Sequence, residues 1–150
     1  MIPGQHNTMW LQASEPGVYR GQCAEFCGLQ HANMIIRVVA DAPADFDRWM
    51  AAQAEPAAPS DATGRRIFET QTCAGCHRVR GTAAEGAVGP DLTHFAGRAT
   101  LGAGVLPTSP DNLRRWITDP QGVKPGVTMP PTTLSADQLN ALVAYLEGLR

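Results

Sequence analysis

Residues 73–77 read CAGCH, in which two cysteines stand three positions apart and a histidine directly follows the second. On a helical turn this spacing puts both thiols on one side, with the imidazole beside them. Two such thiols can bond a porphyrin while the imidazole ligates its iron, which is the attachment pattern of a c-type haem. The alternatives are a structural disulfide or half of a zinc site, but no second CxxC or HxxxH follows to complete the zinc site. Cys73, Cys76 and His77 therefore predict a haem-binding segment.

The sequence around this motif predicts helices. One helix is expected over roughly 61–71, and a second follows the Ser-Pro pair at 109–110 and ends before residue 119. A third covers LSADQLNALVAYLEGL at 134–149, where a Ser-x-x-Gln pair forms a capping box and leucines recur on one face. The C-terminal part of the chain is therefore expected to be an all-α domain.

A methionine lies in the proline-rich stretch KPGVTMPPTTLS, residues 124–135, before the last predicted helix. A lone methionine is more often a core residue than a ligand. Here the prolines fix an irregular loop, and Met129 is the only methionine after residue 50. We therefore expect Met129 to ligate the haem iron.

Residues 61–150 resemble the class I cytochromes c. The resemblance rests on CAGCH, on the methionine loop, on GPDL at 89–92, and on Gly64 and Phe68 in the first predicted helix. It implies that Gly64 and Phe68 pack on an aromatic residue of the last helix, for which Tyr145 is the candidate.

The same resemblance assigns roles at the haem. It implies that Met129 is the axial ligand opposite His77, and that the Pro90 carbonyl accepts a hydrogen bond from the His77 ring. Such a bond fixes the ring and raises its basicity. His94 has no role in this pattern.

A second cysteine pair lies in GQCAEFCGLQHANM, residues 21–34. Two thiols four positions apart, an imidazole four further on and a thioether three beyond form a soft ligand set, which favours copper over magnesium or calcium. A single blue-copper site would use one cysteine, so the second predicts that both sulfurs bridge a pair of coppers. The alternative is a Cys23–Cys27 disulfide in an exported protein, with His31 and Met34 incidental.

This stretch resembles the binuclear copper (CuA) loop of cytochrome c oxidase subunit II, whose pattern Cys-x-Glu-x-Cys-x-x-x-His-x-x-Met it meets at every position. The resemblance implies that Cys23 and Cys27 are bridging thiolates and that His31 and Met34 are terminal ligands. It gives Glu25 two roles, as a copper ligand through its backbone carbonyl and as a magnesium ligand, shared with subunit I, through its carboxylate.

The fold expected before the haem domain is a partial cupredoxin-like β domain over residues 1–50. The stretches TMWLQ, GVYRG and MIIRVVA predict strands, and DFDRWMAAQA predicts a short helix. In the resembling family a further histidine ligand lies upstream, and His6 does not align with it, so the chain is expected to be the tail of a longer or truncated gene product. An Ala/Pro-rich linker is placed at 51–60, before a haem domain at 61–150.

Composition excludes some partners. The net charge is −2 with a pI near 6.0, and no long Lys/Arg run occurs, which argues against nucleic acid. No apolar run approaches the ~20 residues of a membrane helix, and residues 1–20 lack the pattern of a signal peptide. Membrane association is therefore expected only through a missing N-terminal part or through partner subunits.

A copper segment of subunit II followed by a cytochrome c domain resembles the haem-c-containing terminal oxidases. The resemblance implies electron transfer from a donor protein through haem c to the copper pair and on to subunit I, at the periplasmic face of a bacterial membrane. One alternative is a free-standing monohaem electron carrier with a vestigial, metal-free β appendage. Another is a fragment of nitrous oxide reductase, whose copper loop is similar.

Overall fold

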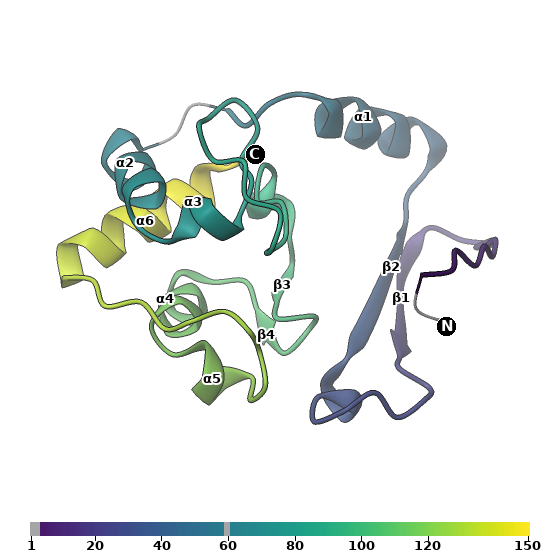
Figure 1. The fold of residues 1–150 in the computed structure, drawn as a ribbon. Coiled ribbons are helices and arrows are strands. Elements are labelled where there is room, and N and C mark those ends of the chain that lie inside the picture. Colours follow the sequence, from purple (N-terminus) through teal and green to yellow (C-terminus); the bar gives the residue numbers. More distant parts are fainter. Residues whose placement is uncertain (1–3, 59–60) are drawn as a thin grey trace.

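The computed structural model describes residues 4–58 and 61–150 (Figure 1). Its N-terminal part is an antiparallel hairpin of β1 (Gly17–Gln22) and β2 (Ile35–Ala40), joined by a loop that holds the 3₁₀ helix η1 (His31–Asn33). Two of the three predicted strands are thus confirmed.

The third predicted strand, TMWLQ at 8–12, was wrong, because the structure gives this stretch no regular secondary structure. A strand needs a partner to satisfy its backbone groups, and within the described residues nothing pairs with this stretch. Met9, Trp10 and Leu11 are all exposed.

Helix α1 (Pro43–Ala54) follows the hairpin. It confirms the helix predicted from DFDRWMAAQA, residues 45–54, whose last four residues had also been placed in the linker. In Figure 1 this helix spans the gap between the hairpin and the C-terminal helices.

The C-terminal part contains the three predicted helices, α2 (Ala62–Thr70), α4 (Pro110–Thr118) and α6 (Ala136–Gly148). Ser109 caps α4 and Ser135 forms the expected capping box with Gln138. Five shorter elements were not predicted: α3 (Cys73–Cys76), η2 (Phe95–Gly97), α5 (Pro120–Val123), and the two-residue strands β3 (Thr100–Leu101) and β4 (Leu106–Pro107).

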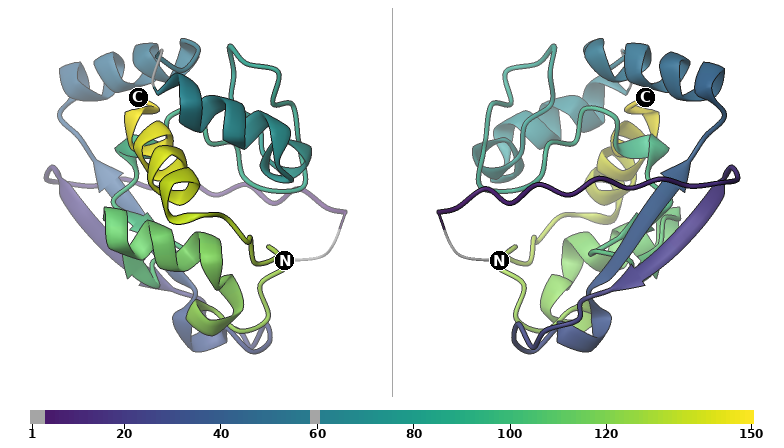
Figure 2. Two further views of the ribbon diagram at one scale, coloured as in Figure 1. Left: turned by 90° about the vertical axis from the view of Figure 1, so that its left-hand side faces the viewer. Right: turned by 90° about the vertical axis from the view of Figure 1, so that its right-hand side faces the viewer.

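The hydrophobic core lies where α2 crosses α6 (Figures 1 and 2). The rings of Phe68 and Tyr145 are 5.7 Å apart, and Gly64 lies against the backbone of α6, as the sequence predicted. Every buried apolar residue of the described chain belongs to the C-terminal part: Ile67, Phe68, Val79, Ala84, Leu92, Phe95, Leu101, Leu113, Ile117, Leu142, Val143, Tyr145, Leu146 and Leu149.

The hairpin contacts the C-terminal part through hydrogen bonds. The Ile35 N–H donates to the Ala103 carbonyl at 3.1 Å, and the Gln30 side chain donates to the Pro125 carbonyl at 2.8 Å. No helix in the described residues is long and apolar enough to cross a membrane.

Candidate functional site

The haem-attachment motif forms a single helical turn. Helix α3 places Cys73 and Cys76 one turn apart, and the His77 N–H donates to the Cys73 carbonyl at 2.9 Å, so the histidine ends the turn. All four cysteines of the chain are free thiols. Burial raises the pKa of Cys73, with a smaller opposing contribution from the backbone.

The His77 ring is held in one orientation. Its Nδ1 lies 2.8 Å from the Pro90 carbonyl oxygen, as the sequence predicted. A carbonyl can only accept, so Nδ1 carries the proton and Nε2 keeps the lone pair that a metal needs. At position 89 only glycine fits, because a Cβ there would lie 2.5 Å from the His77 Cε1 atom. Two free thiols beside an imidazole with an available Nε2 fit the requirements of a c-type haem.

Met129 lies half-buried in the irregular segment between α5 and α6. This segment is fixed from both sides. The Thr132 N–H donates to the Ile117 carbonyl at 3.2 Å, and the Gly126 N–H donates to the Gln121 side chain at 3.0 Å. The loop is therefore anchored to α4 and α5, while the axial role of Met129 stays a prediction.

The second candidate site is the hairpin loop 23–34, which we call the candidate copper loop. The register Gln22↔Ile35 brings its two ends together, and the Cys23 N–H continues the ladder by donating to the Met34 carbonyl at 3.2 Å. Helix η1 begins with His31. The first and last predicted ligands thus face each other across the end of the hairpin.

The candidate copper loop gathers all five predicted ligands around its sulfurs. Cys27 Sγ lies 3.5 Å from Cys23 Sγ, 3.9 Å from His31 Nδ1 and 3.9 Å from Met34 Sδ. The Glu25 carbonyl oxygen lies 3.2 Å from Cys23 Sγ.

The donor set of the loop fits copper, because thiolate, imidazole and thioether are the ligands that copper prefers. The hydrogen bond with Cys23 is the main cause that raises the pKa of Cys27. Cys23, Cys27 and His31 form the only cluster of three or more candidate metal ligands among the described residues, and it includes neither His6 nor the Glu25 carboxylate.

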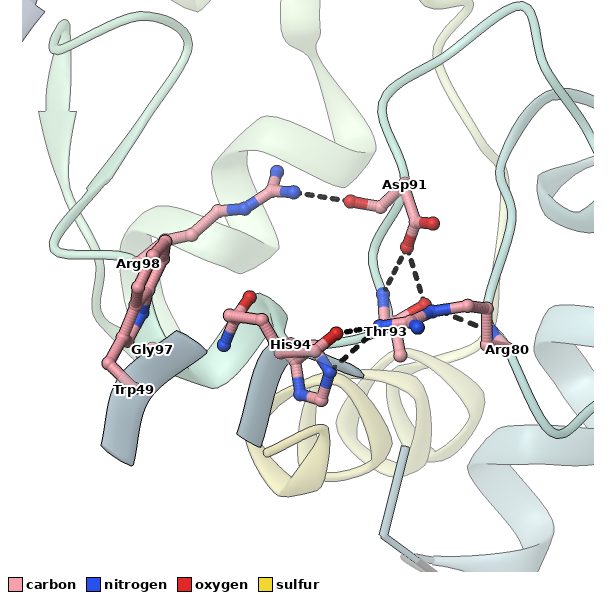
Figure 3. Close-up of a pocket in the computed structure, with 8 residues that line it drawn as sticks. Trp49, Arg80, Asp91, Thr93, His94, Gly97 and Arg98 are labelled. Atoms are coloured by element: carbon pink, nitrogen blue, oxygen red, sulfur yellow. Dashed lines mark hydrogen bonds between the residues drawn. The ribbon is translucent and has the colours of Figure 1, made fainter. Parts of the chain in front are cut away.

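A cavity of about 440 Å³ lies where α1 meets the C-terminal part (Figure 3). Arg80 and His94 reach across it. The Arg80 guanidinium donates to the Ala54 carbonyl at 3.0 Å and to the Gln53 carbonyl, and His94 Nε2 lies 3.1 Å from the Glu55 carbonyl oxygen. The Gln53 and Ala54 carbonyls end α1 and have no partner within the helix, so Arg80 satisfies them from another part of the chain.

Sequence reasoning missed these two residues, since no spacing rule relates them to α1. Arg98 lines the same cavity and donates to the Asp91 carbonyl, and burial lowers the pKa of Arg98.

Comparison with known families divides the chain between two of them. Residues 62–150 match the family Cytochrome c, and residues 1–41 match Cytochrome C oxidase subunit II, periplasmic domain. The chain belongs to the cytochrome c family. Its N-terminal segment is similar to the periplasmic domain of subunit II, as the sequence pattern predicted.

Relatives with the same pair of segments are named cytochrome c oxidase subunit 2. The protein of Alkalihalophilus pseudofirmus is 42% identical over 99% of this chain, and those of Bacillus sp. PS3 and Bacillus subtilis are each 35% identical over 96% and 89%. The chain covers 44%, 44% and 40% of these relatives, so it spans less than half of their length. A haem c follows from the first family and a CuA centre from the second.

Proposed function

We propose that this chain transfers electrons within cytochrome c oxidase, as part of subunit II. One observation carries the proposal: a c-type haem motif and a copper-type ligand cluster occur in one chain. The Pro90 carbonyl holds the His77 ring of the haem motif, and the Gln30–Pro125 hydrogen bond joins the segments that contain the two sites. Haem c and a binuclear copper centre each exchange single electrons when bound.

The chain's own residues would hold and orient the two groups. Cys73 and Cys76 would anchor the haem covalently, and His77 would ligate the iron through Nε2, because Pro90 holds Nδ1. Met129 is the proposed second axial ligand. A thioether in that position keeps the reduction potential of a haem high.

The candidate copper loop would supply ligands to a pair of coppers, with a ligand set that is incomplete within this chain. We propose that Cys23 and Cys27 bridge them, and that His31, Met34 and the Glu25 carbonyl complete the ligands that this loop offers. We propose that the Glu25 carboxylate would bind a magnesium ion shared with subunit I.

The proposed partners are subunit I, the rest of the oxidase and an electron-donor protein. The match to a periplasmic domain supports a site of action on the periplasmic face of a bacterial membrane. We propose domain boundaries at 1–50, 51–60 and 61–150, of which residues 1–3 and 59–60 lie outside the described residues. The linker would begin within the last turn of α1 and would keep the haem domain near the copper loop. The subunit II match favours the oxidase over the nitrous oxide reductase alternative.

The test uses the chain expressed with haem attachment and then supplied with an excess of copper, so that even weak binding by the loop is detected. Photoreduction of the haem should be followed by reduction of copper in the same molecule, seen as bleaching of the copper absorption at a rate independent of protein concentration. A haem-loaded chain that takes up no copper would instead support the free-standing carrier. Copper that is bound but never reduced by the haem would contradict the proposal.

A further inference from the structure

Strand β2 has a hydrogen-bond donor on its outer edge. The Cys23 N–H donates to the Met34 carbonyl, so the adjacent pair, Gln22 and Ile35, is one in which the two residues exchange no hydrogen bonds. The Ile35 N–H therefore points away from β1. It donates to the Ala103 carbonyl at 3.1 Å, so the turn between β3 and β4 satisfies this one donor on the open edge of the hairpin.

The shape of this turn is unusual. Gly102, Ala103 and Gly104 all have positive φ, at 58°, 61° and 90°. Alanine rarely adopts such a conformation, and here it carries the carbonyl that Ile35 uses. A Cβ at position 104 would lie 2.7 Å from the Ile35 Cβ, closer than two carbons can approach, so only glycine allows this contact.

Gln30 makes a second link at the other end of the contact. Its Nε2 donates to the Pro125 carbonyl at 2.8 Å, while its Oε1 accepts from Asn33 at 3.2 Å. Gln30 directly precedes His31, and Pro125 lies four residues before Met129. One side chain thus joins the segment of a proposed copper ligand to the segment of a proposed iron ligand.

We propose that the turn 102–104 and Gln30 are positioning elements, which dock the candidate copper loop in one arrangement against the Met129 segment. The inference rests on the proposed function, since it concerns how the two proposed centres are held relative to each other. The contact uses amides and carbonyls. The ion pairs of the described residues lie within one part or the other: Arg48–Asp45, Arg65–Glu69, Arg78–Glu85 and Arg114–Asp111.

The first experiment measures hydrogen exchange at residues 29–36 of the haem-loaded chain by mass spectrometry. Gln30→Glu keeps the acceptor for Asn33 but loses the donor to Pro125, and it should accelerate exchange by about twofold to tenfold, the range for one lost hydrogen bond. Gln30→Lys keeps a donor of similar reach and should restore protection. The haem spectrum should be the same in all three proteins.

A second pair of variants tests the turn. Gly104→Ala should accelerate exchange at Ile35, because the added methyl pushes the edge of β2 away. In a chain that carries Ile35→Gly the same change should accelerate exchange less, since the Ile35 side chain is gone and only the backbone strain of an alanine at position 104 remains. Gly4→Ala is the matched control, because Gly4 also has a positive φ, at 78°, and a Cβ there meets nothing within 4 Å.

The outcomes separate this inference from the proposed function. Loss of docking should slow haem-to-copper electron transfer in Gln30→Glu and not in Gln30→Lys, whereas a merely structural role would leave the transfer rate unchanged. Unchanged exchange in both Gln30→Glu and Gly104→Ala would overturn the docking, even if electrons still reach the copper. A wild-type chain that binds haem and copper but transfers no electron would overturn the function instead.

Discussion

Gly64 on α2 lies so close to Tyr145 on α6 that a Cβ at position 64 would be 2.5 Å from the Tyr145 Cβ. The helices cross at this point, and no side chain can be added without moving the backbone of α6. We expect Gly64→Ala to lower the free energy of unfolding by roughly 1–3 kcal/mol. Urea unfolding of the haem-loaded protein measures this, and Gly97→Ala should change it by no more than about 0.5 kcal/mol.

Met129→Ala tests the axial ligand. Its segment is anchored to α4 and α5, so the variant should fold normally. The oxidised protein should lose the weak far-red sulfur-to-iron absorption band, and the reduction potential of the haem should fall. An unchanged band and potential would rule Met129 out as a ligand.

Copper binding tests the candidate copper loop. The ligand cluster of the described residues contains one histidine, His31. We expect this chain to bind fewer than two coppers per molecule, or to bind them weakly, because the single imidazole of the cluster can ligate only one of the two metals and metal affinity depends on a full set of ligands. Titration with copper, followed by absorption and paramagnetic resonance, gives the stoichiometry. Two tightly bound coppers with a mixed-valence spectrum would contradict this expectation.

Arg80→Ala tests the contact at the end of α1. The substitution leaves the carbonyls of Gln53 and Ala54 without their charged donor. Hydrogen bonds to charged groups contribute about 1.5–3 kcal/mol, so the last turn of α1 should open more readily. Faster hydrogen exchange at residues 48–55 would show this. Arg66→Ala, which removes an exposed arginine from α2, should leave that exchange unchanged.

The Asp91 carboxylate should make the free energy of unfolding depend on pH. Burial raises its pKa, but hydrogen bonds from Thr93 and the charges of Arg80 and Arg78 outweigh burial, and the pKa falls below its ordinary value of 3.8. A carboxylate with a lowered pKa stabilises the fold above its unfolded pKa, and this contribution is lost as the pH falls through the folded pKa. Asp91→Asn should therefore be less stable than the natural chain at neutral pH, and the difference should shrink as the pH falls through the lowered pKa of Asp91. If the stability difference between Asp91→Asn and the natural chain stays constant as the pH is lowered, the Asp91 carboxylate is not its cause.

The sequence predicted the elements that follow local rules. Spacing alone pointed to Cys73, Cys76 and His77, and a capping box located α6, because both patterns lie within a few residues. The resemblance to known families added Pro90 and Tyr145, which the structure places beside His77 and Phe68. The predicted strand at 8–12 failed, because a local pattern cannot show whether a pairing partner exists.

The contacts between the two parts could not be predicted from the sequence. Gln30 and Pro125 are 95 residues apart, and nothing in either segment marks the other as its partner. The Ile35 contact depends on a turn conformation that Ala103 adopts against its own preference. Arg80 and His94 resemble ordinary polar residues until the position of α1 is known.

All buried apolar side chains of the hydrophobic core lie at or after Ile67. Because the N-terminal hairpin is outside this core, the two parts of the molecule should unfold in a definite order. The hairpin contributes no buried apolar side chain, so its docking rests on a few hydrogen bonds and on the close approach at Gly104. Such a segment forms its own cooperative unit and opens at a lower free energy than the rest of the chain. On gradual heating the candidate copper loop should detach first, while the fold that surrounds His77 stays intact.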